Sequence, residues 1–184
     1  MFQANYKNKT ITAISDTHGN HRELKIPETD FLIHCGDTCT DGNETQLKDF
    51  FDWFGTQPAQ YKIFVAGNHD LPFDLEPGYA AGLVPAAVIY LENRSIVIND
   101  ISFYSVAARP WLHDLPPQIE KIGFLLTHGP PYTILDRGIG CKNLLKFVKR
   151  QKPVYHLFGH IHQHAQQHIV RDGISFANLC CLGL

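Results

Sequence analysis

The chain has 184 residues, of which 44% are hydrophobic and 18% are charged, and its formal net charge is −2 at pH 7. This length suits one well-filled core, so we expect a single domain over residues 1–184. The nearly neutral charge excludes a dedicated electrostatic surface for nucleic acid or anionic membranes, so an anionic substrate has to be held by local groups.

Targeting signals and disulfides are not evident in the sequence. The chain contains no apolar stretch of about 18 residues, and residues 1–9 are polar, so we expect neither a membrane span nor a secretory signal and place the protein in the cytoplasm. Five scattered cysteines without Cys-x-x-Cys spacing argue against a disulfide framework or a zinc ribbon. Histidine, with 11 residues, is the unusual component, and it is the commonest metal ligand in proteins.

The first two predicted strands each end in residues with metal-binding chemistry. Residues 10–15 form the first strand, and the loop after it carries Asp16 and His18. The apolar run over residues 30–35 predicts a buried strand that ends on Gly36 and Asp37. Ligands bind at the carboxyl ends of strands in open α/β sheets, which makes Asp37 a candidate site residue. Taken alone, an aspartate here is more often a turn cap.

The middle of the chain predicts a helix, a third strand and a change to antiparallel structure. Asn43, with Gln46 three residues later, is typical of a helix start, and apolar residues at helical spacing follow up to residue 54. The third strand, residues 61–66, ends on Asn68, His69 and Asp70. Residues 71–85 have room for a short helix. The segments 88–91, 95–98 and 101–106 are typical of antiparallel hairpins.

The last third of the chain repeats the pattern of a strand followed by histidine. Residues 123–126 predict a strand that leads to His128, and a short amphipathic helix follows over residues 141–148. Residues 153–158 predict another strand, followed by His160 and His162. One or two further strands are expected within residues 169–184.

Five strand ends with aspartate, asparagine or histidine would bring about eight oxygen and nitrogen ligands to one sheet edge. Each alone has an ordinary explanation as a turn residue or a core histidine, but together they favour binding of divalent metal. Eight ligands exceed the need of one ion, which indicates two ions about 3.5–4 Å apart. Asp37 is the expected bridge, because a carboxylate can offer its two oxygens to separate ions.

The ordered motifs resemble those of the calcineurin-like metallophosphoesterase superfamily. They are Asp16-x-His18, Gly36-Asp37, Gly67-Asn68-His69-Asp70, Thr127-His128 and Gly159-His160-x-His162. Further motifs resemble a small branch of metallophosphoesterase-domain-containing (MPPED, UPF0046-like) proteins, namely Ile26-Pro27, Thr127-His128-Gly129-Pro130-Pro131 and Gly140-Cys141. The resemblance implies an α+β or α/β fold with four layers, in which helices flank a two-sheet β-sandwich.

The resemblance also implies the roles of the site residues. One ion would be held by Asp16, His18, Asp37 and His162, and the other by Asp37, Asn68, His128 and His160. Manganese is expected first, and iron or zinc are compatible with the same ligands. His69 would steady the phosphoryl group and protonate the leaving oxygen, and Asp70 would orient His69 through a hydrogen bond.

The function implied is hydrolysis of small phosphodiesters, with cyclic nucleotides among the candidates, by in-line attack of a water that the two ions activate. The alternatives are a phosphomonoesterase or nuclease of the same superfamily and a catalytically silent metal-binding scaffold. The expected partner is a small phosphoester, with no membrane and no dedicated nucleic-acid surface.

Some features depart from related phosphatases or have two interpretations. Protein serine/threonine phosphatases of the superfamily carry Asp-Arg-Gly after the second motif, and the arginine is missing here, which counts against phosphoprotein substrates. Arg109 and Arg137 are candidate phosphate clamps, although surface arginines are common. Cys39 is a candidate nucleophile, but we favour a small loop residue, because no basic partner lies beside it in sequence.

Overall fold

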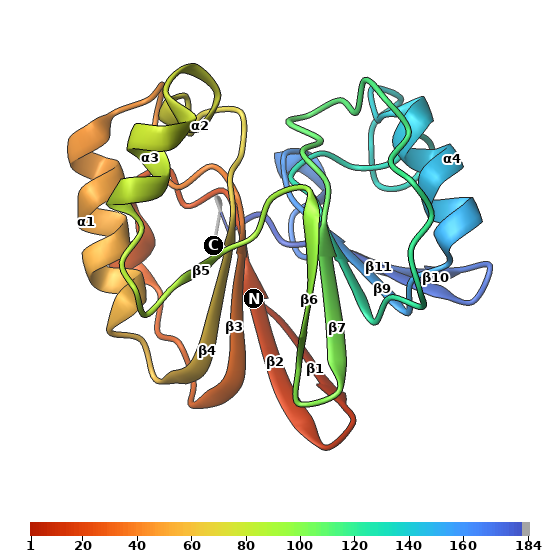
Figure 1. Ribbon diagram of the computed structural model, residues 1–184, viewed down its shortest axis with the longest axis horizontal. Helices are drawn as coiled ribbons and strands as arrows, with labels where there is room; N and C mark the ends of the chain where they lie inside the picture. Colours follow the sequence, from red (N-terminus) through yellow and green to blue (C-terminus); the bar gives the residue numbers. More distant parts are fainter. Residues whose placement is uncertain (182–184) are drawn as a thin grey trace.

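Two β-sheets face each other in the computed structural model, which describes residues 1–181 (Figure 1). Helices cover the outer face of each sheet, so the order of layers is helix, sheet, sheet, helix. This arrangement confirms the four-layer fold with a two-sheet sandwich. None of the helices formed by residues 1–181 has both the length and the apolar character needed to cross a membrane.

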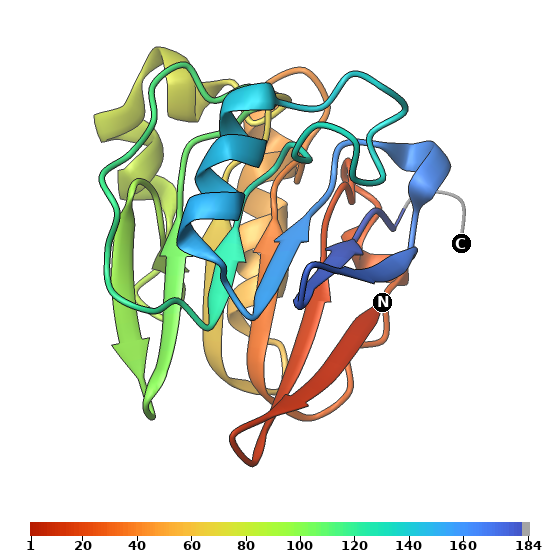
Figure 2. The same ribbon diagram turned by 90° about the vertical axis from the view of Figure 1, so that its right-hand side faces the viewer.

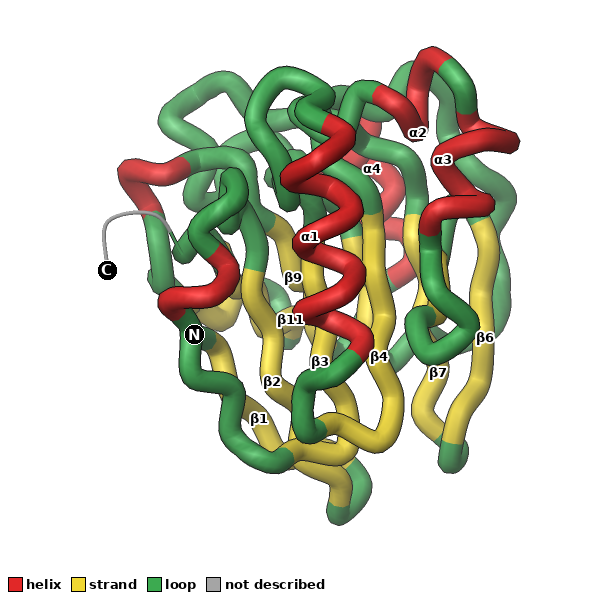
Figure 3. The backbone as a smooth tube through the Cα atoms, turned by 90° about the vertical axis from the view of Figure 1, so that its left-hand side faces the viewer, coloured by secondary structure: helices red, strands yellow, loops and turns green. Residues whose placement is uncertain are grey.

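The first sheet has the strand order β1-β2-β3-β4-β5. Its strands are β1 (Phe2–Tyr6), β2 (Lys9–Ile14), β3 (Thr29–Cys35), β4 (Ala59–Val65) and β5 (Ile89–Tyr90). Strands β2 to β5 run parallel to one another, and β1 is antiparallel to β2. Its outer face is covered by α1 (Glu44–Gly55), α2 (Pro72–Leu75) and α3 (Pro77–Leu83), as Figure 3 shows, and a 3₁₀ turn, η1 (His21–Glu23), follows β2.

The second sheet has the order β10-β11-β9-β8-β7-β6. Its strands are β6 (Arg94–Ile98), β7 (Ile101–Ser105), β8 (Phe124–Leu126), β9 (Tyr155–Phe158), β10 (His168–Arg171) and β11 (Ile174–Asn178). The central strands β7, β8, β9 and β11 are parallel, and β6 and β10 are antiparallel edges. Helix α4 (Lys142–Gln151) covers the outer face (Figure 2), and a 3₁₀ turn, η2 (His162–His164), follows β9.

Apolar side chains fill the space between the sheets and the space beneath each group of helices. Between the sheets, the Phe103 ring lies 5.1 Å from the Phe31 ring and 5.3 Å from the Phe124 ring, centroid to centroid. Under α1, Phe50 and Phe54 stack at 5.1 Å and pack towards Phe64 of β4. Burying aromatic rings on both sides of each sheet stabilises the strands whose ends carry the site.

The predicted start of α1 is correct, with one difference in how its cap works. Asn43 Oδ1 accepts a hydrogen bond from Gln46 N at 3.0 Å, as an N-cap does. Gln46 does not reach back to Asn43, as a capping box would require. Its Oε1 accepts from Thr40 N at 2.8 Å, so the start of α1 is tied to the loop that follows Asp37.

One strand was missed by the sequence analysis, and two predictions, for the hairpins and for the C-terminal segment, need correction or limits. Strand β1 was not predicted, although Phe2, Ala4 and Tyr6 alternate with polar residues. The segment 88–91 was expected in an antiparallel hairpin, but β5 joins the first sheet parallel to β4, with Ile63 opposite Ile89. Only β6 and β7 form the predicted hairpin. The strands expected within residues 169–184 are β10 and β11, and residues 182–184 lie outside the described part.

Candidate metal centre

The loops that follow β2, β3, β4, β8 and β9 lie at the same end of the sandwich (Figure 2). The prediction placed these loops at the edge of one sheet. They follow the carboxyl ends of strands in two sheets, with β2, β3 and β4 in the first sheet and β8 and β9 in the second. Backbone hydrogen bonds join neighbouring loops, such as Asp16 N to Gly36 O at 2.8 Å and Gly159 N to His128 O at 2.8 Å. The predicted ligands are therefore brought together by both sheets.

The first group of candidate ligands consists of Asp16, His18 and His162, whose ligand atoms lie within 4.8 Å of one another. His162 Nε2 lies 3.1 Å from Asp16 Oδ1. His18 Nδ1 donates a hydrogen bond to Cys39 O at 3.2 Å, which leaves Nε2 free to face the other ligands. A backbone carbonyl that holds one ring nitrogen is the usual way of orienting a metal-binding histidine.

The second group consists of Asp37, His128 and His160, again with ligand atoms within 4.8 Å of one another. His128 is fully buried, and its Nδ1 donates to Cys35 O at 2.8 Å, so Nε2 faces the group. Asn68, which belongs to the same predicted set, has a buried Oδ1 atom that accepts no hydrogen bond from any residue in the described part of the chain. A backbone carbonyl therefore orients one histidine in each group.

Asp37 lies between the two groups. Its Oδ2 atom is 3.2 Å from His128 Nε2 and 3.7 Å from His18 Nε2, and its Oδ1 atom accepts a hydrogen bond from His69 N at 2.8 Å. We expected each carboxylate oxygen to serve a separate ion. The structure instead directs one oxygen, Oδ2, towards histidines of both groups and fixes the other on the backbone.

The donor atoms fit divalent metal ions. His18 Nε2 and Asn68 Oδ1 are buried atoms without a hydrogen-bond partner within the described residues, and the buried His128 Nε2 faces the Asp37 carboxylate at 3.2 Å. Burying a polar atom without a partner is costly, and native proteins rarely leave several together. Carboxylate and amide oxygens mixed with imidazole nitrogens are ligands suited to manganese, iron or zinc. Metal binding would supply the partners that these atoms lack.

Backbone strain is concentrated at the same residues. Asp16, His18, Asp37 and His160 have φ angles of 54°, 42°, 58° and 68°, in the left-handed region that residues with a side chain avoid. Such conformations cost on the order of 1–3 kcal/mol each and cluster at functional sites. The loops therefore hold these side chains in positions that local preferences alone would not select.

The charges of the site favour cations. Burial alone would raise the pKa of Asp16, but the hydrogen bond from His162 and the charge of His128 lower it below its usual value. The pKa of Asp37 is also lowered, because His128 outweighs the effect of burial. In turn, burial is outweighed by Asp37 and Asp16, which raise the pKa of His128 to about 9. Two neighbouring buried carboxylates that are ionised attract positive charge, whether proton or metal ion.

The two residues predicted to be catalytic are placed differently from each other. The His69 side chain is 37% exposed, its ring lies 5.0 Å from the His18 ring, and its Nδ1 donates to Asp41 Oδ1 at 2.9 Å. Asp70 is fully buried and accepts from Asp37 N at 2.9 Å and Gly67 N at 2.8 Å. The predicted hydrogen bond from His69 to Asp70 is therefore wrong. Asp70 joins two ligand-bearing loops, and Asp41 holds the histidine ring.

Of the remaining candidates, Arg109 and Cys39 have structural roles, and Arg137 stays a prediction. Arg109 is mostly buried and forms ion pairs with Asp74 at 2.8 Å and Glu92 at 2.6 Å, so it is neither a free clamp nor a surface arginine. Arg137 is exposed in the loop before α4. Cys39 is buried, and burial together with the charge of Asp70 raises the pKa of its thiol, which keeps it unreactive.

Sequence reasoning missed the groups that orient the ligands. Asp41 lies four residues after Asp37 and is followed by Gly42. This Asp-Gly turn was the available signal for a partner of His69. The carbonyl groups of Cys35 and Cys39 leave no trace in the sequence, because every residue has one.

Comparison with known proteins agrees with this geometry. Residues 9–164 match the family described as calcineurin-like phosphoesterase. The chain is 32% identical to human metallophosphoesterase domain-containing protein 1 over 83% of its length, and it is 32% identical to a UPF0046 protein of Caenorhabditis elegans, also over 83%. It spans 60% and 63% of the lengths of these two relatives.

Two solved structures share the fold at low sequence identity. Phosphopantetheinyl hydrolase from Mycobacterium tuberculosis has a TM-score of 0.67 at 15% identity, over 92% of this chain and 88% of that one. The protein TT1561 of Thermus thermophilus has a TM-score of 0.69 at 14% identity, with the same coverage. The sequence match, the relatives and the shared fold together show that this chain belongs to the calcineurin-like phosphoesterase family, a family of metal-dependent phosphoesterases.

Proposed function

We propose that this chain is a phosphodiesterase that hydrolyses small phosphodiesters with two divalent metal ions, manganese first among them. The observation that carries the proposal is the position of Asp37 between two groups of ligand atoms, with Oδ2 at 3.2 Å from His128 and 3.7 Å from His18. Two-metal hydrolases hold their ions about 3.5–4 Å apart, a separation that a shared carboxylate supports.

The ligand sets follow from the two groups. We assign one ion to Asp16, His18, Asp37 and His162, and the other to Asp37, Asn68, His128 and His160. When bound, the two ions would polarise the phosphoryl group and bring the pKa of a water molecule close to neutrality. The protein contributes the fixed orientation of its ligands, through the carbonyl groups of Cys35 and Cys39.

His69 is the proposed general acid. Asp41 binds its Nδ1 atom, which leaves Nε2 as the nitrogen available to donate a proton to the leaving oxygen. The backbone of the same residue holds Asp37, because His69 N donates to Asp37 Oδ1. Asp70 acts through the backbone and fixes the loop of Asp37 against the loop of Asn68.

Arg109, one of the two candidate phosphate clamps, offers no free positive charge for a monoester. A phosphodiester carries one negative charge, whereas a monoester carries about 1.5 to 2 at neutral pH. The guanidinium of Arg109 is already neutralised by Asp74 and Glu92, so it has little capacity to bind the additional charge of a monoester.

Kinetics with matched substrates tests the proposal. We expect kcat/KM with manganese to be higher for bis-p-nitrophenyl phosphate than for p-nitrophenyl phosphate, and a panel of 2′,3′- and 3′,5′-cyclic nucleotides would then define the natural class. Faster turnover of the monoester would indicate a phosphomonoesterase, and cleavage of single-stranded nucleic acid alone would indicate a nuclease.

Two variants separate an enzyme from a silent scaffold. Asp37→Asn should lower the rate by orders of magnitude with any of these substrates, and His69→Ala should do so with an alkyl phosphodiester, whose leaving oxygen needs a proton. Equal rates in wild type and in both variants, measured with metal added back, would contradict the proposal of an enzyme at this site.

A further inference from the structure

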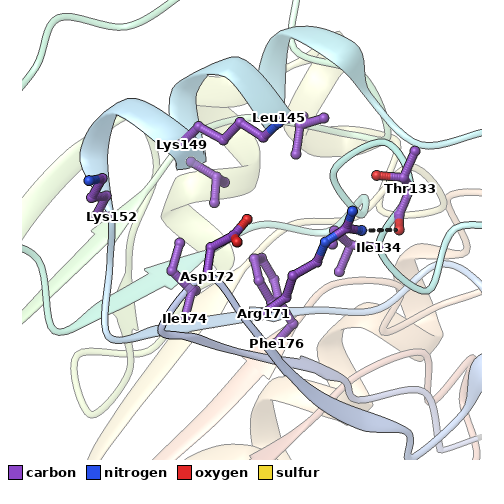
Figure 4. A pocket seen from close by; sticks show the side chains of 10 residues that line it. Thr133, Ile134, Leu145, Lys149, Lys152, Arg171, Asp172, Ile174 and Phe176 are labelled. Carbon is purple, nitrogen blue, oxygen red and sulfur yellow. Dashed lines mark hydrogen bonds between the residues drawn. The ribbon is translucent and has the colours of Figure 1, made fainter.

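A pocket of about 380 Å³ lies between α4 and the β10–β11 hairpin, on the outer side of the second sheet (Figure 4). None of the proposed metal ligands lines it. Its volume falls within the range of about 300–1,000 Å³ that small-molecule sites occupy. It is therefore a separate candidate binding site.

The floor of the pocket is apolar. Ile134, Val148, Ile174 and Phe176 line it, and all four belong to the core beneath α4, with exposures of 0–4%. Leu145 of α4 forms part of the wall. The apolar body of a ligand would contact this floor, and the hydrocarbon surface that it would remove from water belongs mainly to the partly exposed Leu145.

The rim of the pocket is positively charged. Lys149 comes from α4, Lys152 is the residue that follows the helix, and Arg171 comes from β10, against a single carboxylate, Asp172. No ion pair neutralises any of these three cations within the described residues, whereas the whole chain has a net charge of −2. The local excess of positive charge is complementary to an anion.

The two lysines alone have another explanation, because cations near the end of a helix stabilise its dipole. Arg171 has no such explanation. It precedes the two-residue turn of Asp172 (φ 53°) and Gly173 (φ 76°), a tight hairpin loop that fixes its position. Its Nη1 atom donates a long hydrogen bond of 3.4 Å to Thr133 O across the pocket (Figure 4). The guanidinium is thus held over the pocket and retains donors for a ligand.

We propose that this pocket binds a small amphipathic anion. Its acidic group lies against Arg171, Lys149 and Lys152, and its apolar body lies on Ile174 and Phe176. The class is an organic carboxylate, sulfonate or phosphate with an aromatic or branched hydrocarbon part. The site acts independently of the metal centre, and its existence does not rest on the proposed phosphodiesterase activity.

Fluorescence titration of the metal-loaded protein with anilinonaphthalene sulfonate, an amphipathic anion, tests the proposal. The neutral analogue N-phenylnaphthylamine reports on the apolar floor alone. We expect Arg171→Gln to weaken binding of the sulfonate by about tenfold, as expected for loss of one hydrogen bond to a charged group, and to leave the neutral analogue unchanged. Sulfonate binding should also weaken as salt is raised.

The matched control is Arg150→Gln. Arg150 lies on α4, the helix that forms one wall of the pocket. Its guanidinium lies 5.5 Å over the Phe147 ring and donates to Pro116 O, away from the pocket. This variant should bind the sulfonate as wild type does. Leu145→Trp should fill the pocket and abolish binding of both probes, with circular dichroism confirming the fold.

Amide chemical shifts locate the probe. In ¹⁵N-labelled protein, the sulfonate should shift the signals of Thr133 and Gly173 more than those of residues around the metal centre. Equal sulfonate affinities for Arg171→Gln and Arg150→Gln, an absence of saturable binding, or shifts confined to the metal centre would each overturn the proposal.

Discussion

At the scale of single residues, His69 and Asp41 form the pair whose function is most open to kinetic test. The histidine ring is partly exposed beside His18, and among residues 1–181 its one side-chain hydrogen bond is that of Nδ1 to Asp41. That arrangement suits a group that donates a proton to a leaving oxygen and is then recharged from solvent. Cys39, in contrast, is buried with its thiol protonated and takes no part.

Replacing His69 by alanine should lower kcat for an alkyl phosphodiester by about 10² to 10⁴, the usual contribution of a general acid. The loss should be much smaller for a p-nitrophenyl diester, whose leaving group needs no proton. Asp41→Asn should have a weaker effect of the same kind, about 10-fold to 100-fold. Metal content should remain as in wild type. Equal losses for both leaving groups would contradict the role of acid.

At the scale of elements, the loops between strands and helices set the ligand geometry through close backbone contacts. Gly67 follows β4 and lies against the loop of Asp37, and a Cβ atom there would overlap Asp37 Oδ1. At Gly78 in α3, a Cβ atom would meet no described atom within 4 Å beyond the chain neighbours and the backbone of its own helix. The two glycines therefore form a matched pair for testing how tightly the loops are packed.

Gly67→Ala should displace Asp37 and weaken metal binding by about 10-fold to 100-fold, the range seen when groups supporting a ligand are lost. Gly78→Ala should leave metal binding unchanged and stabilise the protein slightly, because alanine reduces the entropy of the unfolded chain. Calorimetric titration with manganese measures the metal affinity of both variants. Similar metal affinities in the two variants would show that the loop tolerates movement.

Elements also show how far the sequence predicts the structure. Strands β2, β3, β4, β8 and β9 were predicted within one or two residues, because each is a short apolar run that ends in a polar loop. The pairing of β5 with β4 was not predicted, because the sheet that a short strand joins depends on neighbours distant in sequence. The candidate ligand residues could be predicted from their residue types and from their positions directly after strands. Asp41 was not predicted, because its contact with His69 requires two loops to meet.

At the scale of the whole molecule, buried histidines link stability to pH. His34 and His156 are fully buried, and burial lowers the pKa of each to about 3. In the unfolded chain a histidine titrates at about 6.5. Between these values the unfolded state binds protons that the folded state does not, so the free energy of unfolding falls as pH decreases from about 6.5 towards 3.

Each such histidine should contribute a slope of about 1.4 kcal/mol per pH unit in that range. His156 is held by Thr127 Oγ1 at 2.9 Å, and His156→Gln retains a polar side chain that does not titrate. Urea unfolding of wild type and variant between pH 4 and 7 measures the difference in slope. We expect the variant to lose less stability on acidification, and parallel curves would contradict this account.

The most direct test of the whole account is the number of metal ions bound by single variants. Wild type should bind two manganese ions, His162→Ala and Asn68→Ala one each, and Asp37→Asn neither with high affinity, because the Asp37 carboxylate faces histidines of both groups of ligands. His164→Ala, two residues beyond His162 and bound to Gln167, is the control and should retain two. Mass-spectrometric metal analysis after dialysis gives the counts. An Asp37→Asn protein that keeps one ion with wild-type affinity would contradict the shared carboxylate at the centre of this site.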